Sequence, residues 1–547
     1  MKNCKHCNTG FQSTDEDRLF YKKMDVSEPT LCPPCRQQRR MTFRNERSLY
    51  KRKCDLTGES FIGIYPDNSS FKVYSPDAWY TDKWDATEYG RDFDFSRPFF
   101  EQYAELQKAA PRIGQIVVNL ENCPYMNQAW YSKDSYLCFD MGFCEHNMFC
   151  DITYHSDYMV DCLSVRNSGY SYQLVDCNKC NNSIFLQDCT NCNDSYFSYD
   201  CNGCNNIAFC SNLRNKSYHL FNKPVSKEEF ERIVSDIKSG SHLKWQEYTK
   251  VFINKVMTDA IRKENHNLNT ENCLGDYLQN CKNAELSFDC SDSEDLRYVT
   301  RGDEKIKSSM DVDNCSLSEV AYESLCISGH NTNFTFNSFH QNNTDLYYCD
   351  TIVNCQNCFG CIALHNKKYC ILNKEYSKEE YEKLVPKIIE HMKSTGEWGE
   401  FFSASLSPFS YNESVAQIYY PLEKSNVINY GWRWKDVDNR EYQAQKIEIP
   451  DNISDFSDDS MNEVLSCESC KKNYKIISQE FSYYKNIGLP IPRTCPTCRY
   501  HDRFNMRNPH NLFKRNCDKC FSPIQTTYSP DNPEKVYCEE CYLKEVY

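Results

Sequence analysis

Glycine is scarce in this chain, with 17 residues in 547. The glycine-rich phosphate loop, the dinucleotide-binding fingerprint and the Gly-x-Ser-x-Gly turn of hydrolases are missing, as is the His-Glu-x-x-His helix of metalloproteases. These absences exclude the enzyme families that those motifs define. The twelve histidines are scattered and assemble no nucleophile with its base, so the sequence leans away from an enzyme.

Long apolar runs and an excess of positive charge are also missing. No stretch reaches the roughly 18 apolar residues that cross a bilayer, and no apolar run follows Met1. We therefore expect a cytoplasmic protein with no signal peptide and no membrane partner. The net charge of −14 argues against a surface that coats nucleic acid uniformly.

Cysteine, by contrast, is abundant, with 35 residues. The number is odd and many of the cysteines form Cys-x2-Cys pairs in a long chain. Disulfide scaffolds are usually short, secreted and evenly paired, so these pairs are better interpreted as zinc ligands in a reducing compartment. A chain of this length is expected to hold three or four domains.

The two ends of the chain carry the same pattern, 463 residues apart and without a gap. The N-terminal cysteines recur at the C-terminus in the same order: Cys4, Cys7, Cys32, Cys35 and Cys54 become Cys467, Cys470, Cys495, Cys498 and Cys517. We assign residues 1–80 and 464–547 to these two terminal modules.

Three sets of four cysteines have the spacing of closed tetrahedral sites: Cys4, Cys7, Cys32 and Cys35; Cys467, Cys470, Cys495 and Cys498; Cys517, Cys520, Cys538 and Cys541. Four thiolates leave no open position, so the sequence predicts three structural zinc ions, with iron as a minor alternative. The N-terminal copy of the last set keeps only Cys54; Thr57, Ser75 and Ala78 fill the other positions. There we expect the fold to persist without metal.

The first site of each module resembles the probable zinc-ribbon domain family of treble-clef type. The resemblance rests on Cys-x2-Cys, an aromatic pair near Tyr21 or Tyr484, and a closing Cys-Pro-x-Cys-Arg, and covers about 35 residues at each end. It implies zinc binding but no particular activity. The whole layout also looks like that of large zinc-ribbon proteins, of unassigned activity, from reduced bacterial genomes.

The centre of the chain is periodic. Six cysteines from Cys138 to Cys201 are spaced 12, 12, 15, 12 and 12 residues apart, each period holding an Asn-rich turn and an aromatic strand. Short strands and turns at a fixed period indicate a solenoid. Since twelve residues can hold one strand and one turn, we expect two units to make one coil of a parallel β-helix.

The periodic region is duplicated. Asn215-Lys216-x-Tyr218 and a Ser226 capping box recur 151 residues later, the second box starting at Ser377. The predicted fold is therefore mainly β, with two solenoid regions, each capped by a helix, between the terminal modules. The predicted divisions are a linker with a helix from Pro98 to Ala110 (81–126), two solenoid regions (127–262 and 268–395), a packed extension (396–450) and an acidic linker (451–463).

Two interpretations of the central cysteines remain open. Buried cysteine is a small hydrophobic residue that a solenoid can stack into ladders, and we favour this reading over additional metal sites. Cys355, Cys358 and Cys361 resemble part of an iron–sulfur run, but no fourth cysteine follows at the required spacing. We therefore expect no cluster there.

Each closing Cys-Pro-x-Cys motif is followed by arginines at four-residue spacing: Arg36, Arg40 and Arg44, and Arg499, Arg503 and Arg507. Residues four apart share one helical face, so these stripes are candidate phosphate contacts. The alternative is a face that only offsets the acidic remainder of the chain. The predicted function is a zinc-binding protein that contacts RNA or a ribosomal surface. Alternatives are a protein-binding scaffold with a tyrosine-rich face and, less favoured, a β-helix carbohydrate enzyme using the row Asp176, Asp188 and Asp200.

Overall fold

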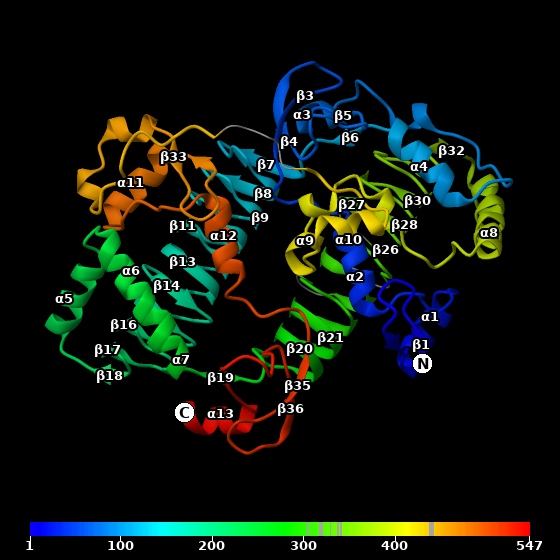
Figure 1. Ribbon diagram of the computed structural model, residues 1–547. Coiled ribbons are helices and arrows are strands. Elements are labelled where there is room, and N and C mark those ends of the chain that lie inside the picture. Colours follow the sequence, from blue (N-terminus) through cyan, green and yellow to red (C-terminus); the bar gives the residue numbers. More distant parts are fainter. Residues whose placement is uncertain (303–305, 317–320, 329, 336–337, 340–341, 437–441) are drawn as a thin grey trace. The chain divides into compact units, whose positions relative to one another are not determined.

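The computed structural model of the chain describes residues 1–302, 306–316, 321–328, 330–335, 338–339, 342–436 and 442–547 (Figure 1). The chain forms two compact units, each built from two separate segments. Unit A contains residues 1–116 and 265–436, and unit B contains residues 117–264 and 437–547. Each terminal module therefore belongs to the unit that contains the more distant periodic region. In the described part of the chain, no helix is both long enough and apolar enough to span a bilayer.

Unit B is organised around a 12-stranded, mostly parallel sheet, which we call the parallel ladder of unit B (Figure 1). Its strands are β7 (Val117–Glu121), β8 (Asn127–Lys133), β9 (Phe139–Gly142), β10 (Asp151–Tyr154), β11 (Asp157–Val160), β12 (Leu163–Arg166), β13 (Gly169–Asn178), β14 (Ile184–Gln187), β15 (Asn193–Tyr199), β16 (Asn205–Ala208), β17 (Ser217–Leu220) and β18 (Lys223–Pro224). Only the last pair, β17 with β18, is antiparallel. The ladder begins ten residues earlier than the sequence predicted.

The register of this ladder corrects the predicted coil. Ile184 pairs with Tyr196 and Leu186 with Ser198, so partners lie 12 residues apart. Two 12-residue units per coil would have placed partners 24 apart. The backbone conformation explains why the chain returns to the sheet after only 12 residues. Every third residue from Asn119 to Phe221 has a positive φ. Each of these left-handed residues turns the chain, and twelve residues contain four such turns.

The three-residue period also fixes the interior. Every third residue from Met126 to Cys210 is buried, and most of these positions hold Cys, Ser, Met or Leu. The hydroxyl of Ser183 donates to the carbonyl of Asn181 at 2.8 Å, and the thiol of Cys189 makes the same bond to Gln187 at 3.4 Å. Serine and cysteine therefore fill equivalent places, because each satisfies its own polar group on the backbone two residues before it.

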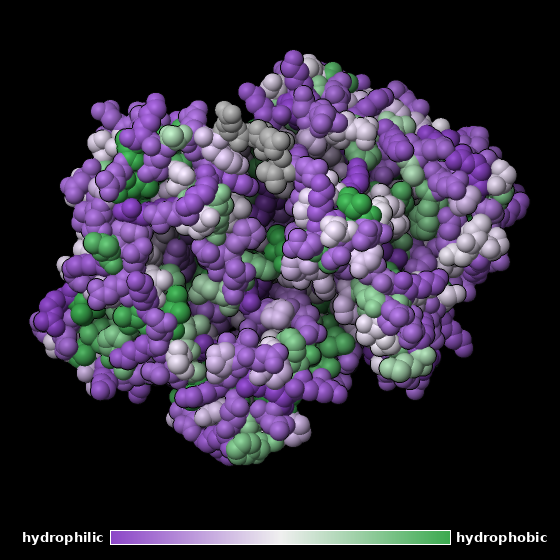
Figure 2. Space-filling model, in the orientation of Figure 1, coloured by the Kyte–Doolittle hydropathy of each residue, from purple (hydrophilic) through white to green (hydrophobic). Residues whose placement is uncertain are grey.

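Helices cover one aromatic column of this ladder. Phe185, Phe197 and Phe209 stack on one another with ring centroids 5.1 and 5.3 Å apart. Trp245 of α6 packs against Phe197. The covering elements are α5 (Lys227–Ile237), α6 (His242–Val251), the π-helix η2 (Phe252–Val256) and α7 (Met257–Asp259). The predicted helix start is found at Ser226, whose side chain accepts a hydrogen bond from the backbone of Glu229. This bond is one of the two hydrogen bonds of a capping box. Figure 2 shows hydrophobic side chains gathered over α5 and α6 on a mainly hydrophilic surface.

Among its described residues, unit A contains three further sheets, which together we call the ladder of unit A. Their strands are β20 (Glu271–Gln279), β21 (Lys282–Ser291), β22 (Glu294–Arg297), β23 (Lys307–Met310), β24 (Asp313–Ser316), β25 (Leu325–Ser328), β26 (His330–Asn333), β27 (Ser338–Phe339), β28 (Thr344–Tyr347), β29 (Ile352–Val353), β30 (Gln356–Phe359), β31 (Lys368–Ile371) and β32 (Lys374–Glu375). The sheets are β20 to β23, β24-β25-β27-β29 and β26-β28-β30-β31-β32, and their pairs are parallel except β31 with β32. Partners are 12 residues apart between β28 and β30 and between β30 and β31, but 11 apart at the start of β20 and β21, 13 between β22 and β23, and 14 between β26 and β28 and between β27 and β29.

Two helices of unit A match the sequence closely. Helix α4 (Phe99–Ala109) occupies the stretch predicted from Pro98 to Ala110, and α8 (Lys378–Thr395) begins at the predicted Ser377 capping box. Both contribute buried residues to the largest core of the unit. The smaller elements of this unit are η1 (Ala86–Tyr89), β6 (Arg112–Ile113), η3 (Ala404–Leu406), η4 (Tyr411–Glu413), α9 (Ala416–Tyr419) and α10 (Lys424–Asn429).

The terminal modules have the same elements in the same order. Each begins with a part that we call the helical module and ends with a part that we call the hairpin module. The helical modules contain β1 (Lys2–Asn3), β2 (Gly10–Phe11), α1 (Asp15–Lys23) and α2 (Pro33–Met41), and β33 (Leu465–Ser466), β34 (Asn473–Tyr474), α11 (Ser478–Ile487) and α12 (Pro496–Phe504). The hairpin modules contain β3 (Tyr50–Lys53), β4 (Ser60–Gly63), β5 (Val73–Tyr74) and α3 (Pro76–Trp79), and β35 (Phe513–Asn516), β36 (Pro523–Thr526), β37 (Lys535–Tyr537) and α13 (Glu539–Val546).

The acidic segment before the C-terminal module is attached at its start. Asp451 accepts hydrogen bonds from the hydroxyl of Ser241 and the backbone of Leu243 at the beginning of α6. Two short 3-10 helices follow, η5 (Ile453–Asp455) and η6 (Asp458–Asn462). Strand β19 (Ile261–Lys263) pairs with β37 and joins the C-terminal hairpin module to unit B.

Candidate metal centres and their attachment

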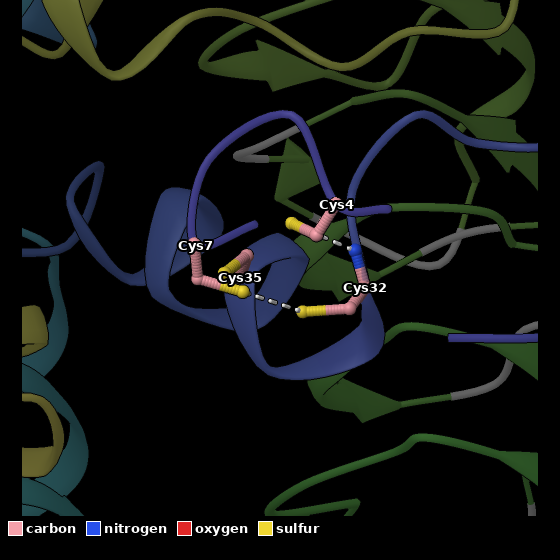
Figure 3. Close-up of side chains that lie close together, drawn as sticks. All are labelled: Cys4, Cys7, Cys32 and Cys35. Carbon is pink, nitrogen blue, oxygen red and sulfur yellow. Dashed lines mark hydrogen bonds between the residues drawn. The ribbon is translucent and has the colours of Figure 1, made fainter. Parts of the chain in front are cut away.

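The three predicted sets of four cysteines each converge on one point. The sulfur atoms of Cys4, Cys7, Cys32 and Cys35 all lie within 4.8 Å of one another, and both C-terminal sets do the same. Figure 3 shows the N-terminal set, with two cysteines on the turn between β1 and β2 and two at the start of α2. All three sets can therefore hold a metal ion.

The geometry fits a tetrahedral thiolate site. In each set, one pair of sulfur atoms drawn from different Cys-x2-Cys turns is 3.7 Å apart. A Zn–S distance of about 2.3 Å places tetrahedral ligands about 3.8 Å from each other. A backbone N–H also points at a sulfur of each set: Cys32 donates to Cys4 at 3.3 Å, Cys495 to Cys467 at 3.2 Å, and Cys538 to Cys517 at 3.3 Å. Such N–H groups orient and stabilise thiolates.

The local environment favours thiolate at some of these positions. The hydrogen bond from Cys35 lowers the pKa of Cys32 to about 5, against the opposing effect of burial. Burial would raise the pKa of Cys467, but the backbone N–H groups of Cys470 and Cys495 outweigh it and lower that pKa to about 6. Deprotonated sulfur is the form that binds metal.

The N-terminal hairpin module keeps the same turn without the ligands. Ser75 donates its backbone N–H to the sulfur of Cys54 at 3.3 Å, as Cys538 does to Cys517. The carboxylate of Asp55 accepts from the backbone of Val73 at 2.7 Å, and Asp518 accepts from Val536 at the same distance. The predicted fold therefore persists at this place, where three of the four thiols are missing.

The arginine stripes are not surface contacts, which corrects the sequence-based assignment. Arg36, Arg40, Arg499 and Arg503 are each at most 3% exposed, and Arg44 is 4% exposed. In unit A the stripe pairs with carboxylates of the parallel ladder: Arg36 with Asp311 at 2.7 Å and Arg40 with Asp313 at 2.6 Å. Arg44 pairs with Glu46 of its own module.

Unit B repeats this attachment with different partners. Arg499 and Arg503 share Asp161 of the ladder, each at 2.9 Å. Arg507 pairs with Asp176 at 2.8 Å, and Arg499 also reaches Glu480 of its own module at 3.1 Å. Burial raises the pKa of Glu480 to about 7, although Arg499 opposes the shift. The stripes therefore attach each helical module to a parallel ladder, and the paired carboxylates satisfy the buried charges.

A tyrosine contact accompanies each attachment. Tyr21 packs against Tyr322 with ring centroids 5.5 Å apart, and Tyr484 packs against Tyr172 at 5.7 Å. The aromatic pair that carries the family resemblance thus contributes to the contact between module and ladder in both units.

The central cysteines form no metal-ligating group among the residues that the structure describes. In the ladder of unit B they occupy interior positions, as the preferred interpretation predicted. Cys355, Cys358 and Cys361 are also buried in the core of unit A. The side chains of Cys315 and Cys326 lie outside the described set.

The aspartate row does not present free carboxylates for catalysis. Asp176 pairs with Arg507, and Asp200 pairs with Arg214 at 2.9 Å and also accepts from Tyr542. Two members of the row are thus used to hold the C-terminal module.

The sequence offered a tyrosine-rich face as an alternative binding surface but did not locate its residues; two exposed aromatic columns lie on the ladder of unit B, and we call them the aromatic face. One column holds Tyr131, Phe143 and His155, with ring centroids 5.2 and 4.9 Å apart. The other holds His146, Tyr158 and Tyr170, at 4.6 and 4.5 Å. The available signal was the 12-residue spacing of aromatic residues within each column.

Comparison with known proteins adds no family to these observations. No family model matches the chain, and no curated protein matches it.

Proposed function

We propose that this chain is a non-enzymatic binding scaffold in which zinc ions stabilise treble-clef and ribbon modules seated on two β-solenoids. Zinc is proposed because four thiolates at tetrahedral spacing leave no position for a substrate. The period of twelve residues with four turns supports a solenoid of one coil per period.

The aromatic face is the observation that carries the binding role. Tyr131 is 53% exposed, Phe143 49% and Tyr170 61%. The other aromatic column of the same ladder, Phe185 to Phe209, is covered by α6 and η2. Exposed apolar surface of this kind marks interaction sites in soluble proteins. We infer that a protein partner covers the aromatic face as α6 covers the other column.

A nucleic-acid partner has less support. The six arginines proposed as phosphate contacts are buried in ion pairs, so binding through them would require each helical module to leave its ladder. Such a change would expose carboxylates such as Asp161 and Asp311 together with the arginines. RNA or ribosome binding through these helices is therefore not the function that we propose.

The test compares partner capture by matched variants of the zinc-loaded full chain. Tyr158→Asn with Tyr170→Asn removes two rings from the aromatic face; asparagine tolerates the left-handed backbone at both sites and already occupies the same column at Asn182. We expect proteins captured by the parent chain to be lost by this variant and retained after nuclease treatment. An identical set of captured proteins for parent and variant would exclude the aromatic face, and loss on nuclease treatment would favour RNA.

A further inference from the structure

The aromatic face borders a strip of negative charge. Its two columns are neighbouring corners of the ladder, since Phe143 and His146, like His155 and Tyr158, are three residues apart. Between the columns runs one outward position per coil. It is occupied in turn by Lys133, Glu145, Asp157 and Gly169: Lys133 pairs with Glu145 and Asp157 with Gly169 through the backbone, and the backbone N–H of Glu145 donates to the carboxylate of Asp157.

Lys133 is the only cationic residue among these four positions, and three carboxylates lie near it. Lys133 pairs with Glu121 at 3.1 Å, and the negative charges of Glu121, Asp134 and Glu145 together raise its pKa. Glu145 and Asp157 are exposed and form no ion pair within the described part of the chain. The strip therefore keeps unpaired negative charge between two rows of rings.

The rings leave room for a cation. Stacked rings touch at about 3.5–4.0 Å, whereas the centroids in these columns are 4.5 to 5.2 Å apart. The rings are therefore offset, and part of each ring face stays uncovered. A guanidinium or ammonium group placed over such a face gains roughly 0.5–1 kcal/mol at an exposed site, and the neighbouring carboxylates add charge attraction.

We propose that the aromatic face binds an arginine- or lysine-rich segment of a protein partner; this rests on the scaffold function proposed above. Unpaired carboxylates repel phosphate, so the charge selects a cationic chain over a nucleic acid. Arginine is the better fit, because its planar group stacks on rings and also donates to carboxylates. The cationic side chains lie over the ring columns and pair with Glu145 and Asp157.

The test measures binding of a fluorescent peptide of alternating arginine and serine to the zinc-loaded full chain by anisotropy across a salt series. Glu145→Gln with Asp157→Asn removes the charge and retains an acceptor for the backbone N–H that Asp157 accepts at 2.7 Å. Glu247→Gln with Asp259→Asn, on the exposed surface of α6 and α7, is the control with the same change in net charge. Zinc content and thermal unfolding verify that each variant is folded.

We expect the strip variant to weaken peptide binding about tenfold at low salt, in line with the loss of two charge-assisted contacts, and the control to leave it within twofold. Tyr158→Asn with Tyr170→Asn should weaken binding at low and high salt alike. Equal weakening by strip variant and control would overturn the proposal, because the peptide would then follow net charge alone. Absence of peptide binding, or tighter binding of single-stranded RNA to the same face, would also overturn it. The scaffold function is tested separately. It would be wrong if the variant carrying Tyr158→Asn and Tyr170→Asn captured the same proteins as the parent chain.

Discussion

The two hairpin modules show the same fold with and without a complete set of four thiols. Both have the same hairpin, the same short strand and the same hydrogen bond from the backbone N–H of that strand to an aspartate carboxylate. The C-terminal copy has four thiols and a small core of its own around Cys517, Ile524 and Val536. The N-terminal copy has one thiol, and its Cys54 and Trp79 belong to the largest core of unit A.

The difference indicates that packing takes the place of the four-thiol set in the N-terminal copy. Trp79 and Val73 are fully buried in unit A, and Ala78 stands where the C-terminal copy has the ligand Cys541. A module that shares a large core gains stability from burying apolar surface. A module with a small separate core depends on a metal or another cross-link. Four experiments test this comparison and the contacts around it, beginning with the largest expected effect.

Removing the metal should have the largest effect. Structural zinc contributes about 10–16 kcal/mol to the folding of small modules, far more than the core of the C-terminal hairpin module can replace. With a strong chelator we expect residues 513–547 to lose protection from hydrogen exchange while residues 50–80 keep theirs. Mass spectrometry of the native protein should count three zinc ions before chelation. Equal loss of protection in the two hairpin modules would contradict the comparison.

Removing a shared carboxylate should rank next. Asp161→Asn leaves Arg499 and Arg503 without their common partner, and we expect a loss of about 3–5 kcal/mol in the free energy of unfolding. Asp311→Asn should cost less, because Arg40 keeps Asp313 and Arg36 still lies 4.0 Å from Glu323. Arg503, by contrast, has no second carboxylate partner among the described residues. Chemical denaturation of both variants measures the difference. The attachment described for the two helical modules would be wrong if neither variant changed stability.

Restoring the missing ligands should have a smaller effect on stability but should clearly raise the zinc content of the protein. Thr57→Cys, Ser75→Cys and Ala78→Cys together recreate the four-thiol set around Cys54. Since the backbone turn is already present, we expect a fourth zinc ion per chain. The gain in stability should be modest, because this module is already held by the core of unit A. A zinc content that stays at three ions per chain would show that the backbone turn around Cys54 no longer has a geometry that binds metal.

An interior thiol should matter least. In Cys189→Ser the hydroxyl can donate to the carbonyl of Gln187, as Ser183 donates to Asn181. We expect a cost of about 1 kcal/mol or less and an unchanged zinc count. Loss of a zinc ion in this variant would revive the metal interpretation of the central cysteines.

The sequence predicted the local features well. Ligand sets, capping boxes and the helix after Pro98 depend on residues close in the chain, so spacing alone is enough to find them. The coil was misjudged because a 12-residue period does not reveal how many turns it contains; the left-handed residues that make four turns include Tyr and Phe as well as Asn.

The arginine stripes were misread for a different reason. A four-residue spacing defines one helical face but not what covers that face. The carboxylates that pair with Arg36 and Arg499 lie 275 and 338 residues away in the chain. Nothing in the local sequence indicates these pairs, and they arise only because each terminal module joins the unit containing the more distant ladder.

Because inward-facing positions recur every third residue, the ladders are sensitive to insertions and deletions. A single inserted residue would turn every later inward side chain toward solvent, unless the extra residue were looped out within its own coil. Unit A departs from the 12-residue step between β22 and β23, where partners are 13 residues apart, and between β26 and β28, where they are 14 apart. Homologous chains should therefore differ in length at these coils, while the uninterrupted 12-residue steps of unit B resist insertion and keep the aromatic columns in line.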